Sequence, residues 1–160
     1  MAANEGKKST EKDLPGPARL ALKLGSGAHA GLYRATGGKL FGRMGKSPIL
    51  LLNTVGRKTG KQRTSPLLYV MDGEAFVVIA SKGGAPTHPA WYLNLMANPE
   101  ATVEIGDREV RVEAEVATPE DKPRLWQMMV EMYPTYDDYQ RKTERDIPLL
   151  ILRPVEGGAS

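Results

Sequence analysis

The segment from Gly56 to Arg63 holds the densest set of residues that could bind an anion. It reads GRKTGKQR, and its basic residues are Arg57, Lys58, Lys61 and Arg63. Glycine lets a backbone approach a ligand closely, and guanidinium and ammonium groups bind phosphate and carboxylate. A Walker loop is excluded, because three residues separate the two glycines and Gln62 follows Lys61 where serine or threonine is required. The pattern predicts either a grip for phosphate or carboxylate, or a solvated basic hairpin.

Two further groups of chemically capable residues follow the apolar run AFVVIA. Ser81, Lys82 and two glycines form a polar turn that could present backbone donors to a planar or anionic ligand. No G-x-S-x-G elbow surrounds Ser81, which argues against a serine nucleophile. His88 could be a general acid or base, or could cap the helix that begins beside it. Trp91 could stack on a flat cofactor or fill the core.

Half of the six tyrosines lie within seven residues, in MYPTYDDYQ. These are Tyr133, Tyr136 and Tyr139, and their spacing of three places them on one side of a helical turn. Phenol groups can line an aromatic substrate pocket and donate a proton to a reduced product. Packing of the same rings at a helix end is the alternative.

Charge is unevenly distributed along the 160 residues, although the net charge is only +3. Residues 14–71 contain ten basic residues and no acidic one, whereas residues 72–160 contain nine basic and 16 acidic residues. This favours an anionic partner for the first half, such as nucleic acid, an anionic membrane or a phosphorylated or carboxylated small molecule. Neutralisation between the two halves is the alternative. Nucleic acid ranks last, because the chain has no recognition helix and no aromatic RNA-binding signature.

Several site classes are excluded by composition. The absence of cysteine excludes disulfides, thiolate zinc sites, iron–sulfur clusters and thiol nucleophiles. Two histidines are too few for a typical transition-metal site, so no metal is expected. The glycines of residues 25–30 do not form a dinucleotide fingerprint, because no strand precedes them and no acid follows at the required distance. No apolar run reaches membrane-spanning length and the start is charged at both signs, which predicts a cytoplasmic protein.

The elements that position these residues are mainly strands. We expect a mobile polar arm over 1–13, a basic helical or irregular segment over 14–47, and a β domain over 48–155. Hairpin signals at Asp72-Gly73 and Gly106-Asp107 join strands in pairs. One helix is expected to begin at His88-Pro89, and another at Thr118 as N-cap with Pro119 at the first helical position. The six predicted strands are 48–55, 64–71, 74–80, 101–105, 108–117 and 148–154. An antiparallel sheet that closes into a small barrel with inserted helices follows.

Three ordered runs carry a family resemblance: LLNTVGRKTGKQRTSPLLYV (51–70), VVIASKGGAPTHPAWYLNLMANP (77–99) and MYPTYDDYQRKTERDIPLLIL (132–152). Together they resemble the deazaflavin-dependent nitroreductase family of actinobacteria, over residues 48–154. The resemblance implies a split antiparallel β-barrel, as in flavin reductases and FMN-binding proteins. It also implies coenzyme F420, an 8-hydroxy-5-deazaflavin with a phospholactyl and polyglutamate tail.

The resemblance further assigns expected roles to residues at matching positions. Arg57, Lys58, Thr59 and Arg63 match positions that hold the phosphate and the tail carboxylates; Thr64, Ser65, Pro66, Leu67 and Leu68 match the segment along the deazaflavin; Ile79, Ala80, Ser81 and Lys82 match the turn at the polar edge of the ring; Ala90, Trp91 and Asn94 match the covering helix face; and Tyr133, Tyr136 and Tyr139 match the substrate side.

The implied reaction is hydride transfer from C5 of reduced F420 to an electron-poor acceptor. A quinone is favoured, with incidental reduction of nitroaromatics, and an activated alkene is the alternative acceptor. Tyr136 or Ser81 is expected to hydrogen-bond the acceptor. An FMN-dependent oxidoreductase of the same barrel superfamily and a non-catalytic F420 carrier remain open. The basic tract before Pro48 is expected to contact an anionic membrane at the inner face of the plasma membrane. Barrels of this type are often homodimers.

Overall fold

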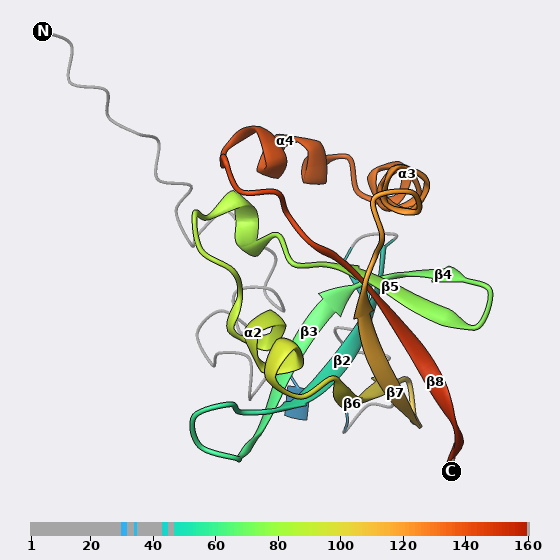
Figure 1. The fold of residues 1–160 in the computed structure, drawn as a ribbon. Coiled ribbons are helices and arrows are strands. Elements are labelled where there is room, and N and C mark those ends of the chain that lie inside the picture. Colours follow the sequence, from blue (N-terminus) through green and yellow to red (C-terminus); the bar gives the residue numbers. More distant parts are fainter. Residues whose placement is uncertain (1–29, 32–33, 35–42, 45–46, 160) are drawn as a thin grey trace, which may run out of the picture.

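The computed structural model describes residues 30–31, 34, 43–44 and 47–159 (Figure 1). The predicted arm over 1–13 lies outside these residues, as does most of the basic segment over 14–47. Within that segment, Ala30, Gly31 and Arg34 are helical.

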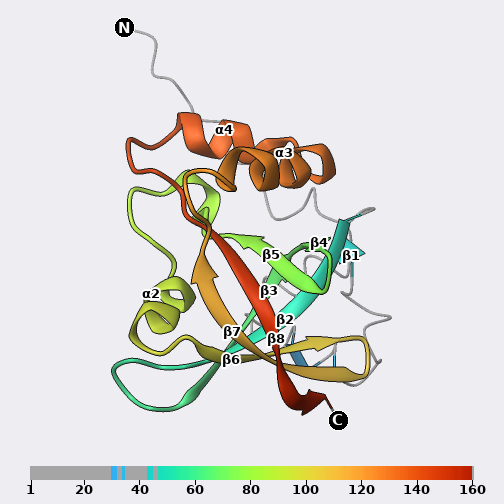
Figure 2. The same cartoon turned by 45° about the vertical axis from the view of Figure 1, so that its right-hand side comes forward.

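Eight described strands form one antiparallel sheet that returns on itself. They are β1 (Arg43–Met44), β2 (Ser47–Val55), β3 (Gln62–Leu68), β4 (Val70–Asp72), β5 (Ala75–Ile79), β6 (Glu100–Ile105), β7 (Arg108–Val116) and β8 (Leu149–Ala159). The strand order is β1-β2-β6-β7-β8-β5-β4, and β3 pairs with the other side of β2. Because β3 continues through Tyr69 into β4, the path comes back to β2 and closes the barrel (Figures 1 and 2). The predicted split antiparallel barrel is confirmed.

All six predicted strands occur, and one of them is divided. The predicted strand over 64–71 is interrupted at Tyr69, because its first half pairs with β2 and its second half with β5. The two predicted hairpin turns are present, with Gly73 at φ +61° and Gly106 at φ +60°. β8 pairs with both β5 and β7, and so places the C-terminal segment inside the sheet.

Two layers of apolar side chains hold the fold together. On β5, Phe76 and Val78 face the barrel interior, whereas Val77 and Ile79 face the second core. Both faces of β5 are therefore buried, which is why its sequence is continuously apolar. β7 instead alternates, with Val110, Val112 and Ala114 buried and the residues between them exposed.

Within residues 47–159, four helical segments cover the barrel. They are the 3-10 turn η2 (Lys82–Gly84), α2 (Ala90–Ala97), α3 (Lys122–Met132) and α4 (Thr135–Arg141). In Figures 1 and 2, α3 and α4 lie together over one end of the barrel and α2 lies lower, near β2 and β3. The second core packs beneath α3 and α4, through Leu125, Met129 and Tyr136.

The helix expected to begin at His88-Pro89 is present as α2, but two predicted helix caps are wrong. His88 does not cap α2, since Pro89 occupies the N-cap and no side chain bonds the helix end. Helix α3 begins at Lys122 with Asp121 as N-cap, whereas Thr118 was expected to cap it. Thr118 instead closes a turn ahead of the helix, accepting a hydrogen bond from the Asp121 N–H at 3.3 Å. Pro123 explains the difference, because it has no N–H and is tolerated only in a first turn.

Candidate active site

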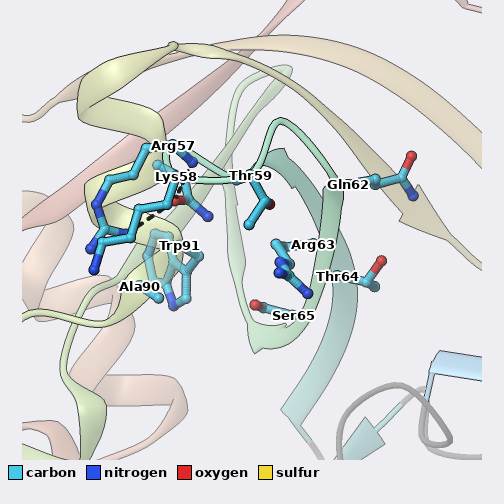
Figure 3. Close-up of a pocket in the computed structure, with 11 residues that line it drawn as sticks. Arg57, Lys58, Thr59, Gln62, Arg63, Thr64, Ser65, Ala90 and Trp91 are labelled. Atoms are coloured by element: carbon cyan, nitrogen blue, oxygen red, sulfur yellow. Dashed lines mark hydrogen bonds between the residues drawn. The ribbon is translucent and has the colours of Figure 1, made fainter.

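Two adjoining cavities hold the predicted site residues. The first, of about 670 Å³, is lined by Gly56, Arg57, Lys58, Thr59, Gln62, Arg63, Thr64, Ser65, Ala90, Trp91 and Asn94 (Figure 3). The second, of about 440 Å³, is lined by Ser65, Pro66, Leu67, Leu68, Ile79, Ser81, Lys82, Gly83, Pro89, Trp91, Tyr133, Tyr136 and Tyr139. Ser65 and Trp91 belong to both linings, so the two cavities form one groove along β3 and α2.

The basic segment is the loop of the β2–β3 hairpin, and its backbone is fixed from within. The Gly56 N–H donates to the Lys61 carbonyl at 2.8 Å, and the Gly60 N–H donates to the Gly56 carbonyl at 2.8 Å. A Cβ at Gly56 would lie 2.9 Å from Thr59 Oγ1 and 3.1 Å from the Lys61 carbonyl, so a side chain here would crowd the loop. The loop thus closes upon itself, and Arg57, Lys58 and Arg63 lie at the cavity wall.

Asn94 fastens this loop to α2. Its Oδ1 accepts hydrogen bonds from both the Arg57 backbone N–H and the Arg57 guanidinium, each at 3.2 Å. Its Nδ2 donates to Thr54 Oγ1 at 3.1 Å. The Asn94 side chain is buried and hydrogen-bonded through both its oxygen and its nitrogen, so its structural contribution is to hold Arg57 beside the helix.

Strand alternation sorts the side chains of β3. Arg63 and Ser65 point toward α2 and Trp91, whereas Gln62 and Thr64 point to the opposite side of the strand (Figure 3). Thr64 Oγ1 donates to Asn53 Oδ1 at 2.6 Å on that side. Gln62 and Thr64 therefore border the cavity without aiming their polar groups into it.

The groove is electropositive. Its cationic side chains are Arg57, Lys58, Arg63 and Lys82, and no aspartate or glutamate of the described residues lines either cavity. Arg34, another basic residue of the first half, does not line the groove and forms a hydrogen-bonded ion pair with Glu104 at 2.6 Å. That hydrogen bond is the main reason why the pKa of Glu104 is held below its usual value. Charge from the basic half is thus partly neutralised within the fold and partly directed into the groove.

A strained turn forms one edge of the second cavity. The backbone of Ser81 is in the right-handed helical conformation (φ −80°, ψ −38°), and the backbone of Lys82 is in the left-handed one (φ +46°). Such an alternation turns successive N–H groups to one side, where they can receive a negative or partly negative oxygen. Trp91 is only 7% exposed, and it packs in the barrel core while lining both cavities. The core interpretation of Trp91 is confirmed, and stacking on a flat cofactor stays a prediction that its position in the cavity wall allows.

The three tyrosines form a cluster at the far side of the second cavity. The Tyr133 and Tyr136 rings meet edge to face at 5.1 Å, and the Tyr133 and Tyr139 hydroxyl groups lie 3.5 Å apart. Burial raises the pKa of Tyr136 well above its usual range. The hydrogen bond with Tyr133, followed by burial, raises the pKa of Tyr139 to about 12. These two phenols therefore keep their protons at neutral pH.

Nearly every residue predicted for the site lines one of the two cavities. Ala80 is the exception, since it is fully buried beneath the turn. His88 is also absent from both linings, and burial and the charge of Arg145 lower its pKa. The sequence interpretation missed Arg145, which bonds the carbonyl oxygens of the turn. No spacing signal connects it with a turn some sixty residues earlier.

Comparisons with known proteins decide the family. The family model described as F420H(2)-dependent quinone reductase matches residues 26–154. The chain belongs to this family. An F420H(2)-dependent quinone reductase of Mycobacterium tuberculosis is 42% identical over 128 residues, which cover 78% of this chain and 86% of that protein. The chain is therefore an oxidoreductase with coenzyme F420 as its cofactor.

Solved structures agree with this assignment. An F420-H2 dependent reductase (FDR-A) is 42% identical with a TM-score of 0.62, covering 66% of this chain and 94% of that one. A domain-swapped dimer is 37% identical with a TM-score of 0.64, covering 79% of this chain and 96% of that one. The Vibrio cholerae protein HutZ shares the fold at 18% identity and a TM-score of 0.55, over 72% of this chain and 88% of its own. Among the described residues of the reductase, no helix is long and apolar enough to span a bilayer.

Proposed function

We propose that the groove binds coenzyme F420 with its anionic tail in the first cavity and its ring in the second. The supporting observation is the distribution of charge and apolar surface. Arg57, Lys58 and Arg63 line the first cavity, and cations of this kind bind phosphate and carboxylate groups. The second cavity is lined mainly by apolar and aromatic side chains, which suit a flat ring.

The residues around the second cavity also match the chemistry of the ring. Pro66 and Leu67 on β3 provide an apolar wall, and Trp91 provides a flat surface across the groove. The turn at Ser81 and Lys82 offers N–H donors to the polar edge of the ring. The fit thus involves charge, shape and hydrogen bonding, each supplied by a different element.

When bound, reduced F420 supplies a hydride. The contribution of the chain is to hold ring and acceptor together and to exclude water between them. A quinone that takes up a hydride also takes up one proton to become a hydroquinone. We propose that the Tyr136 hydroxyl or Ser81 donates a hydrogen bond to the acceptor oxygen. Because burial raises its pKa, the Tyr136 hydroxyl keeps the proton until the acceptor oxygen gains charge.

The acceptor class can be tested directly. A quinone follows from the family, and we propose nitroaromatics as incidental acceptors because a nitro group presents similar oxygens to the same donors. Anaerobic oxidation of reduced F420 should proceed with the highest kcat/KM for a menaquinone analogue, a lower value for a nitroaromatic and a lower one still for an enone. A higher kcat/KM for the enone than for the quinone would contradict this ranking.

We also propose peripheral contact with anionic membranes, where quinones reside. The support is the basic charge of residues 14–47, most of which lie outside the described residues. Sedimentation with vesicles rich in phosphatidylglycerol should exceed sedimentation with phosphatidylcholine vesicles and should weaken with salt. Exchanging Arg19 and Lys23 for glutamine should reduce it while leaving the Arg34–Glu104 pair intact. Equal sedimentation of the unmodified protein and of the glutamine variant would reject the proposal.

A homodimer is proposed on the likeness to the structure described as a domain-swapped dimer. Light scattering coupled to size-exclusion chromatography should give twice the chain mass of 17.5 kDa. A monomer mass across micromolar concentrations would reject it.

A further inference from the structure

The guanidinium group of Arg145 is surrounded by backbone carbonyl groups of the turn beside the second cavity. Its Nε donates to the Ala85 carbonyl at 2.8 Å, its Nη1 to the Ala80 carbonyl at 3.2 Å and its Nη2 to the Ser81 carbonyl at 2.7 Å. Nη1 also lies 3.2 Å from His88 Nδ1. Arg145 itself belongs to neither described lining.

This arrangement needs arginine and not merely a positive charge. A guanidinium group offers five N–H donors in a planar fork, whereas an ammonium group is a compact point charge. The carbonyls come from both ends of the η2 turn, so a single rigid group ties the two ends together. The turn also contains Lys82 at φ +46°, a left-handed conformation that is unfavourable for a residue with a Cβ. Such a turn persists only where its surroundings hold it.

The backbone of Arg145 is fixed to α4, the helix that carries Tyr136 and Tyr139. Its carbonyl accepts a hydrogen bond from Gln140 Nε2 at 2.9 Å, and Gln140 Oε1 accepts one from the Ile147 N–H at 3.0 Å. Gln140 lies on α4 next to Tyr139. Arg145 is thus joined to α4 through its backbone and to the turn through its side chain.

We propose that Arg145 is a positioning residue of the reductase, setting the separation between the Ser81–Lys82 turn and α4. The turn and the two tyrosines of α4, Tyr136 and Tyr139, line the second cavity together, so their relative placement sets its shape on this side. The role rests on the proposed placement of the ring in this cavity. Arg145 acts through the turn and has no contact with the tail or the acceptor.

The test compares R145K and R145A with R153A. Arg153 is a matched surface control, since it pairs with Glu115 on the outside of the sheet at 2.7 Å. Hydrogen exchange of the protein without cofactor should become at least about tenfold faster at Ser81–Gly84 in R145K. Exchange in the β2–β3 loop should not change, and R153A should resemble the unmodified protein. Lysine keeps the charge, so this variant separates the fork from the charge.

Cofactor binding supplies a second readout. At a temperature well below unfolding, R145K and R145A should bind F420 at least about tenfold more weakly by fluorescence titration. The slope of log Kd against log salt should stay that of the unmodified protein, because the cations of the first cavity remain. Millimolar ethylguanidine should restore affinity to R145A and should have no effect on R153A.

Unchanged exchange at the turn in both Arg145 variants would overturn the proposal. A changed salt slope, or faster exchange over the whole barrel, would also overturn it, since Arg145 would then support the fold in general. Failure of the unmodified protein to bind F420 would contradict the proposed function instead, and the exchange measurement would still decide the role of Arg145.

Discussion

Replacing Gly84 by alanine tests how closely the η2 turn packs against α4. Gly84 has φ +81°, and a Cβ there would lie 2.6 Å from the Tyr139 carbonyl oxygen and 3.1 Å from Tyr139 Cα. The left-handed conformation costs about 1–2 kcal/mol with a Cβ. Overpacking against backbone that cannot rotate away adds about 1–3 kcal/mol. G84A should therefore lower the free energy of unfolding by about 2–5 kcal/mol.

Gly83 is the matched control for this experiment. Its φ is +63°, and a Cβ there would meet nothing within 4 Å. G83A should therefore cost only the backbone contribution of about 1–2 kcal/mol. Urea denaturation followed by circular dichroism measures both variants, and the m-value checks that unfolding stays two-state. Equal losses for G83A and G84A would refute the close packing of turn and helix.

Three further outcomes are expected. Burial and then the charge of Arg145 lower the pKa of His88, so the unfolded chain binds a proton more readily than the folded protein. The free energy of unfolding should therefore fall as the pH drops below about 6.5, and urea melts of H88Q should lack this pH dependence. Arg34 lowers the pKa of Glu104, so E104Q should cost about 1 kcal/mol or less at pH 7, a difference lost as the pH falls below about 4.5. Y136F should lower kcat with a quinone at least about tenfold while leaving F420 affinity unchanged.

Local patterns predicted the barrel, the basic loop and the tyrosine cluster, because each depends on residues close in sequence, whereas most other lining residues were expected only from the resemblance. The alternation in β7 and the Asp72-Gly73 turn specify strands and hairpins directly. The tyrosine spacing predicted one helical face, although Pro134 separates a short helix, α4, from α3. The resemblance supplied the cofactor, which no residue pattern in this chain could have named.

Features that depend on distant contacts escaped prediction. β3 and β4 are divided at Tyr69 because the residues before it pair with β2, whereas the residues after it pair with β5. Helix α3 starts at Lys122 because Pro123 must lie in its first turn. A capping pattern alone does not take this second proline into account. Arg145 reaches the turn only after the chain has passed through β6, β7 and the three helices α2, α3 and α4.

The central claim is that the first cavity holds the anionic tail of F420. The direct test measures the affinities of F420 and of the tail-less deazaflavin for the unmodified protein, for R57A/K58A and for K61A. Lys61 is a matched control, because it lies in the same loop but outside the described lining of the first cavity. The double variant should bind F420 at least about tenfold more weakly, since about 1.4 kcal/mol corresponds to tenfold and charged hydrogen bonds contribute about 1.5–3 kcal/mol. Its affinity for the tail-less ligand should not change, and K61A should resemble the unmodified protein. An equal loss for both ligands, or no loss for either, would contradict the account.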